Sequence, residues 1–113
     1  MVTIFHNPRC RKSREGLSFL QENNIDFEIR DYFKNPFSKE ELSSLLSKLN
    51  IEPIELIRKQ EDIYKKEMKG KEFSREAMLE MMILNPKLIQ RPIVAQNNKA
   101  VLALPPEKIN SIL

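Results

Sequence analysis

Several features that would point directly to a function class are missing from this chain of 113 residues. Its single cysteine rules out an internal disulfide. No apolar run is long enough to span a membrane and no N-terminal stretch resembles a signal peptide, so we expect a cytoplasmic protein. The net charge of +3 is small and the lysines are scattered among glutamates, which does not by itself make a nucleic-acid-binding face. A positive field near one site that attracts a small anion fits this charge equally well.

The segment around the one cysteine carries the most chemistry. The β-branched and aromatic residues 2–5 predict a short buried strand, and residues 6–10 predict a polar turn that ends at Cys10. An amphipathic helix should follow, which places Cys10 at a helix N-terminus, where free backbone N–H groups and the helix dipole favour negative charge. Cationic side chains flank the cysteine on both sides: Arg9, Arg11, Lys12 and Arg14.

These surroundings favour a reactive thiolate at Cys10. A free thiol titrates near about 8.5, whereas thiols at helix N-termini beside cations can titrate at roughly 3.5–7.5. The same N–H groups and arginines would hold a tetrahedral oxyanion against the sulfur. The alternative is a buried, inert cysteine, which is the commoner fate of a lone cysteine. Two flanking arginines argue against that alternative, because a core cysteine would have apolar neighbours.

The first helix and the strand after it are predicted from their patterns. The helix should bury Leu17, Leu20 and Phe19 and end near residues 23–24. Residues 25–32 alternate apolar with polar, as a half-buried strand does. A helical crossover makes the two strands a parallel pair.

Residues 36–90 are predicted to form a helical insertion. A capping box at Ser38 starts its first helix, and a second, short helix is expected over residues 54–58. Ser74 caps a third, which is expected to bury Ala77, Met78, Met81, Met82 and Leu84.

The C-terminal part predicts an antiparallel strand pair. Residues 93–96 and 99–103 are joined by an Asn-Asn turn, residues 97–98, for which we expect positive φ at both positions. A short helix from Pro105 closes the chain. The order is β-α-β, helical insertion, β-β-α within one domain of residues 1–113, since no linker or repeat suggests a second domain.

That order, with a cysteine after the first strand and a proline before the third, is similar to the thioredoxin-like fold, an α/β fold with a mixed four-stranded sheet. Three motifs make the resemblance specific. Residues 6–14 fit the H-x-x-x-C-x-x-x-R pattern of the ArsC family of glutaredoxin-coupled arsenate reductases, whose relatives include the Spx and YffB proteins. Residues 56–59 resemble its L-[LI]-R-[KT] stretch, and residues 85–94 resemble its segment around R-P-[IV]. The similarity spans nearly the whole chain.

The resemblance implies a mechanism centred on Cys10. In such reductases the cysteine thiolate attacks arsenate, and glutathione and glutaredoxin supply the reducing thiols, so no resolving cysteine is needed. His6 and Ser13 match positions that lower the thiol pKa or hydrogen-bond the sulfur, and Arg14 completes the motif. From the residues alone, His6 could equally be a turn residue and Ser13 an ordinary first-turn residue. No metal and no bound cofactor is implied.

The resemblance also implies a substrate site. Arg58 and Arg91 match arginines that bind the oxyanion, for which a guanidinium fork is suited, and Asn7 and Arg11 are expected to assist. Arg58 could instead be a surface cation that complements a helix dipole. The bond before Pro92 matches the family's cis-proline, which brings Arg91 beside the cysteine.

One position departs from the family pattern. Leu104 stands where these reductases carry a third anion-binding arginine in a stretch like L-C-R-P. Losing a charge-assisted hydrogen bond costs on the order of 1.5–3 kcal/mol, or about ten- to a hundredfold in affinity. Arg9 and Arg11 are the nearby cations that could compensate.

Three functions are therefore compatible with the sequence. The first is a monomeric ArsC-family thiol oxidoreductase acting on arsenate or a similar small oxyanion with glutathione and glutaredoxin. The second is a glutathione-dependent reductase of another small substrate. The third is a non-catalytic regulator like the Spx proteins, which bind RNA polymerase. Residues 10–13 lack the second cysteine of the Spx C-x-x-C motif, and its absence excludes a disulfide switch.

Overall fold

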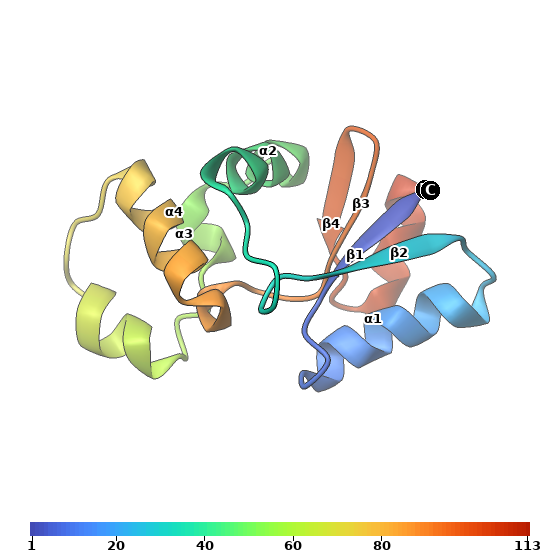
Figure 1. The fold of residues 1–113 in the computed structure, drawn as a ribbon, viewed down its shortest axis with the longest axis horizontal. Coiled ribbons are helices and arrows are strands. Elements are labelled where there is room, and N and C mark those ends of the chain that lie inside the picture. Colours follow the sequence, from blue (N-terminus) through green and yellow to red (C-terminus); the bar gives the residue numbers. More distant parts are fainter. The chain divides into compact units, whose positions relative to one another are not determined.

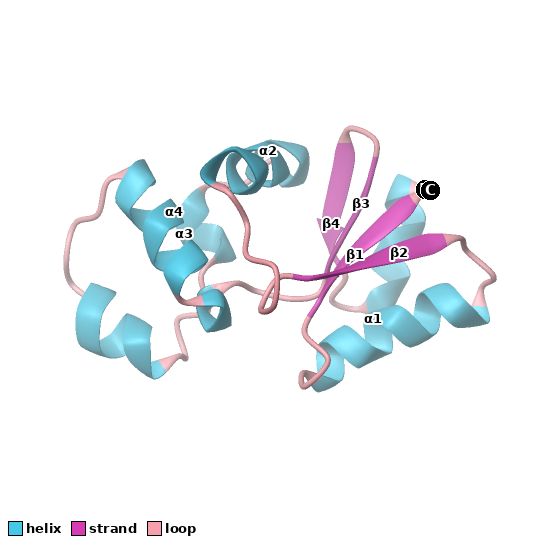
Figure 2. Ribbon diagram, viewed as in Figure 1, coloured by secondary structure: helices cyan, strands magenta, loops and turns pink.

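The computed structural model describes residues 1–113 and divides them into two compact units. The sheet unit comprises Met1–Asn35 and Arg91–Leu113, and the helical unit comprises Pro36–Gln90 (Figure 1). All four strands belong to the sheet unit, whereas the helical unit consists of helices joined by loops and one isolated β-bridge (Figure 2). No helix in the chain combines the length and the apolar character that a membrane crossing would need.

The sheet unit is built on a mixed sheet in the order β2-β1-β3-β4. Its strands are β1 (Val2–His6), β2 (Phe27–Asp31), β3 (Ile93–Gln96) and β4 (Lys99–Leu102). Strands β1 and β2 are parallel, and β3 is antiparallel to both β1 and β4. The predicted thioredoxin-like fold with a mixed four-stranded sheet is thus confirmed.

Two helices cover one face of this sheet. These are α1 (Arg11–Glu22) and the 3-10 helix η3 (Pro106–Ile112), which pack against each other and against the strands. The apolar side chains of alternate strand residues and of the inward helix faces form one core: Val2, Ile4, Leu20, Val94, Ala103, Ile109 and Ile112. This core fixes where α1 begins relative to the end of β1, and hence where Cys10 lies.

Two expectations for the sheet unit are wrong. Strand β2 is shorter than predicted and forms the edge of the sheet, so that Ile29 is 52% exposed instead of buried. An edge strand has a neighbour on one side only, and sequence alternation alone does not reveal this position. In the turn between β3 and β4 only Asn97 has positive φ, at 55°, and Asn98 does not. Positive φ at both positions is required only in a type I′ turn.

The helical unit follows its local signals closely. It contains α2 (Lys39–Leu49), α3 (Pro53–Leu56), the π-helix η1 (Tyr64–Met68), α4 (Arg75–Leu84) and the 3-10 helix η2 (Pro86–Leu88). The predicted capping box is present, since the Glu41 N–H donates to Ser38 Oγ at 3.1 Å and the Ser38 N–H donates to Glu41 Oε1 at 3.0 Å. Asn50 ends α2 in the left-handed region, with φ at 57°.

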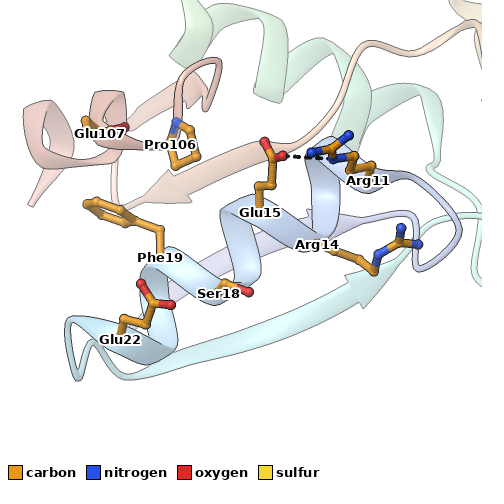
Figure 3. Close-up of a pocket in the computed structure, with 8 residues that line it drawn as sticks. All are labelled: Arg11, Arg14, Glu15, Ser18, Phe19, Glu22, Pro106 and Glu107. Carbon is orange, nitrogen blue, oxygen red and sulfur yellow. Dashed lines mark ion pairs between the residues drawn. The ribbon is translucent and has the colours of Figure 1, made fainter.

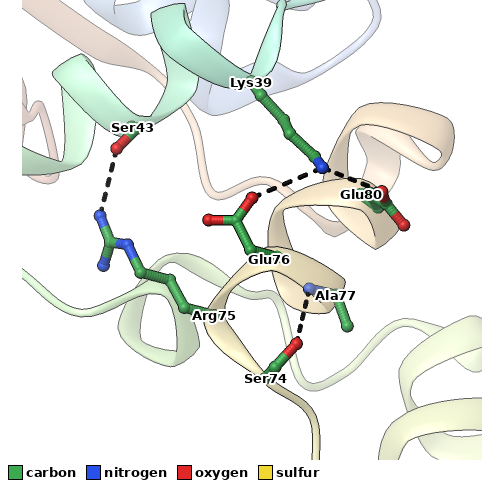
Figure 4. A network of polar contacts seen from close by, with 7 residues as sticks. All are labelled: Lys39, Ser43, Ser74, Arg75, Glu76, Ala77 and Glu80. Atoms are coloured by element: carbon green, nitrogen blue, oxygen red, sulfur yellow. Dashed lines mark hydrogen bonds and ion pairs between the residues drawn. The ribbon is translucent and has the colours of Figure 1, made fainter.

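Ion pairs join α2 to α4 within this unit. Lys39 Nζ lies 3.4 Å from Glu76 Oε2 and 3.0 Å from Glu80 Oε1, as Figure 4 shows. Arg75 Nη2 donates to Ser43 Oγ at 3.4 Å, and Ser74 caps α4 through the Ala77 N–H (Figure 4). Because these contacts are exposed to solvent, each contributes little stability.

Two expectations for the helical unit also need correction. The short helix ends at Leu56, and Ile57 pairs with Ile89 in an isolated antiparallel bridge. Leu84 is 76% exposed because it lies about 200° around α4 from the buried Met82. Leu79, which is buried and was not expected, occupies the inward face one turn earlier.

Candidate active site around Cys10

Cys10 is the N-cap residue of α1 and is half-buried. Its own N–H donates to the Asn7 carbonyl at 2.9 Å, and its carbonyl accepts from the Arg14 N–H at 3.0 Å. The predicted turn and helix start are therefore correct. The N–H groups of Lys12 and Ser13, in the first turn of α1, act on the sulfur and lower its pKa, although Cys10 makes no side-chain capping hydrogen bond of ordinary length and angle.

The pKa of the Cys10 thiol lies below its ordinary value. Partial burial acts to raise it and is the largest single influence. A hydrogen bond from the Arg91 side chain, the N–H groups of Ser13 and Lys12, and the positive charge of Arg91 together outweigh burial and lower the pKa. The site therefore stabilises a thiolate at the place where an incoming anion would meet a guanidinium.

Asn7 and Ser13 hold the loop that presents the cysteine. The Asn7 N–H donates to Ser13 Oγ at 3.3 Å, and the Arg9 N–H donates to Asn7 Oδ1 at 3.1 Å. Both residues are buried, with Ser13 fully so. The Ser13 hydroxyl oxygen thus accepts a hydrogen bond from the loop backbone, while the Ser13 N–H helps to lower the pKa of the Cys10 thiol. The polar contacts of the Asn7 side chain recorded in the structure also lie within the loop.

Arg14 and Arg11 lie at the rim of the site. Arg14 Nη1 donates to the Pro8 carbonyl at 3.1 Å, so the last residue of the predicted motif braces the loop from outside. Arg11 pairs with Glu15 at 3.3 Å, and its side chain is 85% exposed. Its guanidinium is thus exposed to solvent but already paired with a carboxylate of the same helix.

His6 lies at the end of β1, opposite Asp31 of β2. It is 5% exposed, and its Nδ1 has no hydrogen-bond partner. Burial lowers the pKa of His6, Asp31 acts to raise it, and Arg14 lowers it further. The net shift is downward, so the ring is neutral at neutral pH.

The Arg91-Pro92 peptide bond is cis, as the resemblance predicted. Gly16, in the second turn of α1, lies directly against Pro92: a Cβ at this position would be 2.8 Å from Pro92 Cγ. We did not single out Gly16 from the sequence. The available signal was an isolated glycine inside a helical pattern, which usually has a packing reason.

The segment that carries Leu104 is hydrogen-bonded to Pro92. The Ala103 N–H donates to the Pro92 carbonyl at 3.0 Å, and Leu104 follows in a second cis peptide bond, Leu104-Pro105, which the sequence did not lead us to expect. Leu104 itself is half-buried.

Arg58, the remaining predicted ligand, belongs to the helical unit and is described with it. Its guanidinium Nη1 lies 3.1 Å from Glu61 Oε2, and both side chains are 23% exposed. Its N–H donates to the Leu88 carbonyl at 2.7 Å, which ties it to the end of the 3-10 helix η2. The side chain is therefore held in place by a neighbouring carboxylate.

A shallow groove of about 520 Å³ runs along the solvent side of α1 to the start of η3 (Figure 3). Phe19 and Pro106 supply its apolar surface, and charged groups of both signs surround them. Figure 3 shows the Arg11–Glu15 pair at one end, near the start of α1. Because its charges largely balance, the groove does not select an anion, and Cys10 does not line it.

Comparison with known proteins agrees with this geometry. The model of the ArsC family matches residues 5–112. The chain is 42% identical to the Escherichia coli (strain K12) protein YfgD, covering 99% of this chain and 96% of that protein. It is 36% identical to an arsenate reductase of Neisseria meningitidis serogroup A, covering 99% and 97%. The solved structure of an arsenate reductase from Vibrio cholerae matches with a TM-score of 0.94 at 38% identity, over 99% of this chain and 97% of that one. The chain therefore belongs to the ArsC family, a family of thiol oxidoreductases.

Proposed function

We propose that the protein is a cysteine-dependent reductase in which the Cys10 thiolate attacks arsenate or a similar small oxyanion, with glutathione and glutaredoxin as reductants. The observation that carries the proposal is the setting of the Cys10 sulfur at the start of α1, where Arg91 hydrogen-bonds it and the N–H groups of Lys12 and Ser13 help to lower its pKa. These donors stabilise the thiolate and would then bind the oxygens of the anion that it attacks.

The proposed chemistry balances in three steps. The Cys10 thiolate forms a sulfur–arsenic bond, and one arsenate oxygen leaves as water after protonation. A glutathione thiolate then attacks the Cys10 sulfur, and the electron pair of the sulfur–arsenic bond goes to arsenic, which changes from As(V) to As(III). A glutaredoxin thiolate then attacks the glutathione sulfur of the mixed disulfide between Cys10 and glutathione, which releases the Cys10 thiolate and leaves glutathione in a disulfide with glutaredoxin.

The other predicted site residues, His6 excepted, have roles in this scheme. Arg91 would bind the charged oxygens in the bidentate manner for which guanidinium is suited. The resemblance to the family motif also predicts that Arg58 is an oxyanion ligand. Arg11, exposed beside the site, would attract the anion electrostatically. Asn7, Ser13 and Arg14 would keep the cysteine loop in shape through the contacts described above.

A second candidate is a glutathione-dependent reductase of another small substrate. Leu104 favours it, since an apolar, half-buried side chain stands where the reductases of the family carry an arginine. The thiolate and its donors would serve both reactions equally, so only the substrate differs.

The test is a coupled assay with purified protein, glutathione, glutaredoxin, glutathione reductase and NADPH, with and without arsenate. We expect NADPH consumption that depends on arsenate and is absent in Cys10→Ser. If NADPH consumption does not depend on arsenate while Cys10 still alkylates rapidly at neutral pH, arsenate is discarded as the substrate and the second candidate is supported. Slow alkylation together with no turnover would discard both and favour a non-catalytic role.

A further inference from the structure

Gly16 faces inward from α1 at the point where the helix meets Pro92. The residue is buried, and a methyl group there would lie 2.8 Å from Pro92 Cγ, 3.5 Å from Pro92 Cβ and 3.6 Å from Ile4 Cδ1. Carbon atoms in contact are normally about 3.5–4.0 Å apart. The closest contact is with a rigid proline ring, which cannot rotate away as a long side chain can.

The backbone does not require glycine at this position. Gly16 has ordinary helical geometry, and Gly70 is the one glycine of the chain with positive φ. Glycine inside a helix is less favourable than alanine, because it loses more conformational freedom on folding. Glycine is therefore needed at position 16 because it has no side chain, and not because its backbone is freer than that of other residues.

The ring that touches Gly16 is covalently bound to the arginine at the active site. Arg91 precedes Pro92, and its side chain hydrogen-bonds the Cys10 sulfur. On its other side Pro92 is fixed by the sheet, because its carbonyl accepts the Ala103 N–H at 3.0 Å and β3 begins at Ile93. Pro92 is thus held between α1 and the β-sheet, and any shift of the ring moves Arg91 relative to the N-terminus of α1.

We propose that Gly16 is a positioning residue: by leaving room for Pro92 against α1, it sets the distance at which the Arg91 guanidinium meets the Cys10 sulfur. Two small buried residues on successive turns, Ser13 and Gly16, form the inward face of α1 nearest the cysteine. Ser13 accepts a hydrogen bond from the cysteine loop, and Gly16 packs against Pro92, the residue after Arg91. Helix α1 therefore positions both the cysteine loop and the Arg91 segment, through two residues whose side chains do not contact the sulfur.

The test measures the rate of Cys10 alkylation by iodoacetamide against pH in the wild type, Gly16→Ala, Arg91→Ala and the double variant. Gly16→Ala should raise the pKa of Cys10 by about 1, toward the Arg91→Ala value, since it weakens a charged partner of the thiolate. Below both pKa values, alkylation should slow about tenfold. In the Arg91→Ala background, Gly16→Ala should change the pKa no further, which is the signature of action through Arg91.

Two control variants separate positioning from mere loss of stability. Ser18→Ala introduces alanine at an exposed position of the same helix and should leave the pKa of Cys10 unchanged. Leu20→Val weakens the buried face of α1 one turn beyond Gly16 and should lower the melting temperature without changing the pKa. If Gly16→Ala is unfolded, Pro92→Ala, which removes Pro92 Cγ and with it the contact to Gly16, is measured instead and should raise the pKa of Cys10 only when Arg91 is present.

A folded Gly16→Ala protein with the wild-type pKa overturns the proposal, as does an equal pKa change with and without Arg91. Although the inference rests on Cys10 being the reacting group of the proposed function, alkylation requires neither arsenate nor glutaredoxin. The inference can therefore fail while arsenate reduction is observed, or hold while it is not.

Discussion

At the scale of single residues, Cys10 draws its chemistry from one side chain and from its place at a helix start. Partial burial alone would make this thiol harder to ionise, and Arg91 together with two N–H groups reverses that effect. A charged hydrogen bond contributes more than a neutral one, which makes Arg91 the most sensitive residue of the site.

We predict that Arg91→Ala raises the pKa of Cys10. The thiolate is the reactive form, so the alkylation rate rises with pH and levels off above the pKa. Loss of the guanidinium should move this curve to higher pH by about 1 or more. Arg91→Lys, which keeps the charge and loses the fork, should fall between the two. Superimposable profiles for wild type and Arg91→Ala would contradict the role of Arg91.

Leu104→Arg is predicted to strengthen binding of arsenate. Leu104 follows Ala103, which is hydrogen-bonded to Pro92, so a new guanidinium would be attached close to Arg91 of the proposed anion site. A charge-assisted hydrogen bond contributes about 1.5–3 kcal/mol, which corresponds to roughly ten- to a hundredfold in KM. The comparison is made with Leu104→Gln in the coupled assay. An unchanged KM in Leu104→Arg would show that position 104 does not reach the substrate.

His6 should make the stability of the fold depend on pH. Burial holds the pKa of His6 below its ordinary value of 6.5, with Asp31 opposing and Arg14 assisting the shift. The unfolded chain therefore takes up a proton at a higher pH than the folded chain does. The stability is complete above about pH 6.5 and is lost as the pH falls toward the folded pKa.

Urea unfolding of the wild type and of His6→Gln across this range tests that dependence. The free energy of unfolding of the wild type should drop by more than that of the variant on going from neutral to mildly acidic pH. Equal pH dependence in both proteins would show that His6 titrates the same way folded and unfolded.

At the scale of elements, the junction between the cysteine loop and α1 depends on Ser13. Its hydroxyl oxygen accepts the buried Asn7 N–H, so Ser13→Ala should cost about 1–3 kcal/mol of stability by leaving that N–H unpaired. The Ser13 N–H at the sulfur is retained, so the pKa of Cys10 should change little. Chemical unfolding and the alkylation profile measure both effects, with Ser18→Ala as control. A raised thiol pKa at unchanged stability would instead mean that the hydroxyl serves the sulfur directly.

Elements with explicit local signals were predicted well, because capping residues, asparagine at C-termini and the cysteine turn act within a few residues. The start of α2 at Ser38 and the end at Asn50 are examples. Properties that depend on tertiary neighbours were not predictable. The exposure of Ile29 follows from the edge position of β2, and that of Leu84 from which side of α4 is covered.

The same distinction holds for the site. Cys10, Ser13 and Arg91 come together as expected from the motif and the fold. The division of labour at Ser13, hydroxyl to the loop and N–H to the sulfur, could not be read from its position in the sequence. Gly16 was missed because its importance depends on a contact with Pro92, which is remote in the chain.

At the scale of the whole molecule, the chain interrupts a compact sheet unit with a helical unit of 55 residues, Pro36–Gln90. The sheet unit by itself contains the nucleophile, its helix N-terminus and Arg91, whereas Arg58 comes from the helical unit. Thiol activation should therefore be a property of the sheet unit. The family motif predicts that Arg58 binds the oxyanion and takes no part in activating the thiol. Arg58→Ala is expected to raise KM for arsenate while leaving the alkylation profile of Cys10 unchanged. A shifted alkylation profile would show that Arg58 also acts on the thiol.

The measurement that tests the central claim most directly is the intact mass of the protein after incubation with arsenate and glutathione, without glutaredoxin. The account predicts a mixed disulfide of one glutathione with Cys10 that forms with arsenate and fails to form without it or in Cys10→Ser. An unmodified protein under the same conditions, with a Cys10 that still alkylates rapidly at neutral pH, would contradict arsenate reduction through this cysteine.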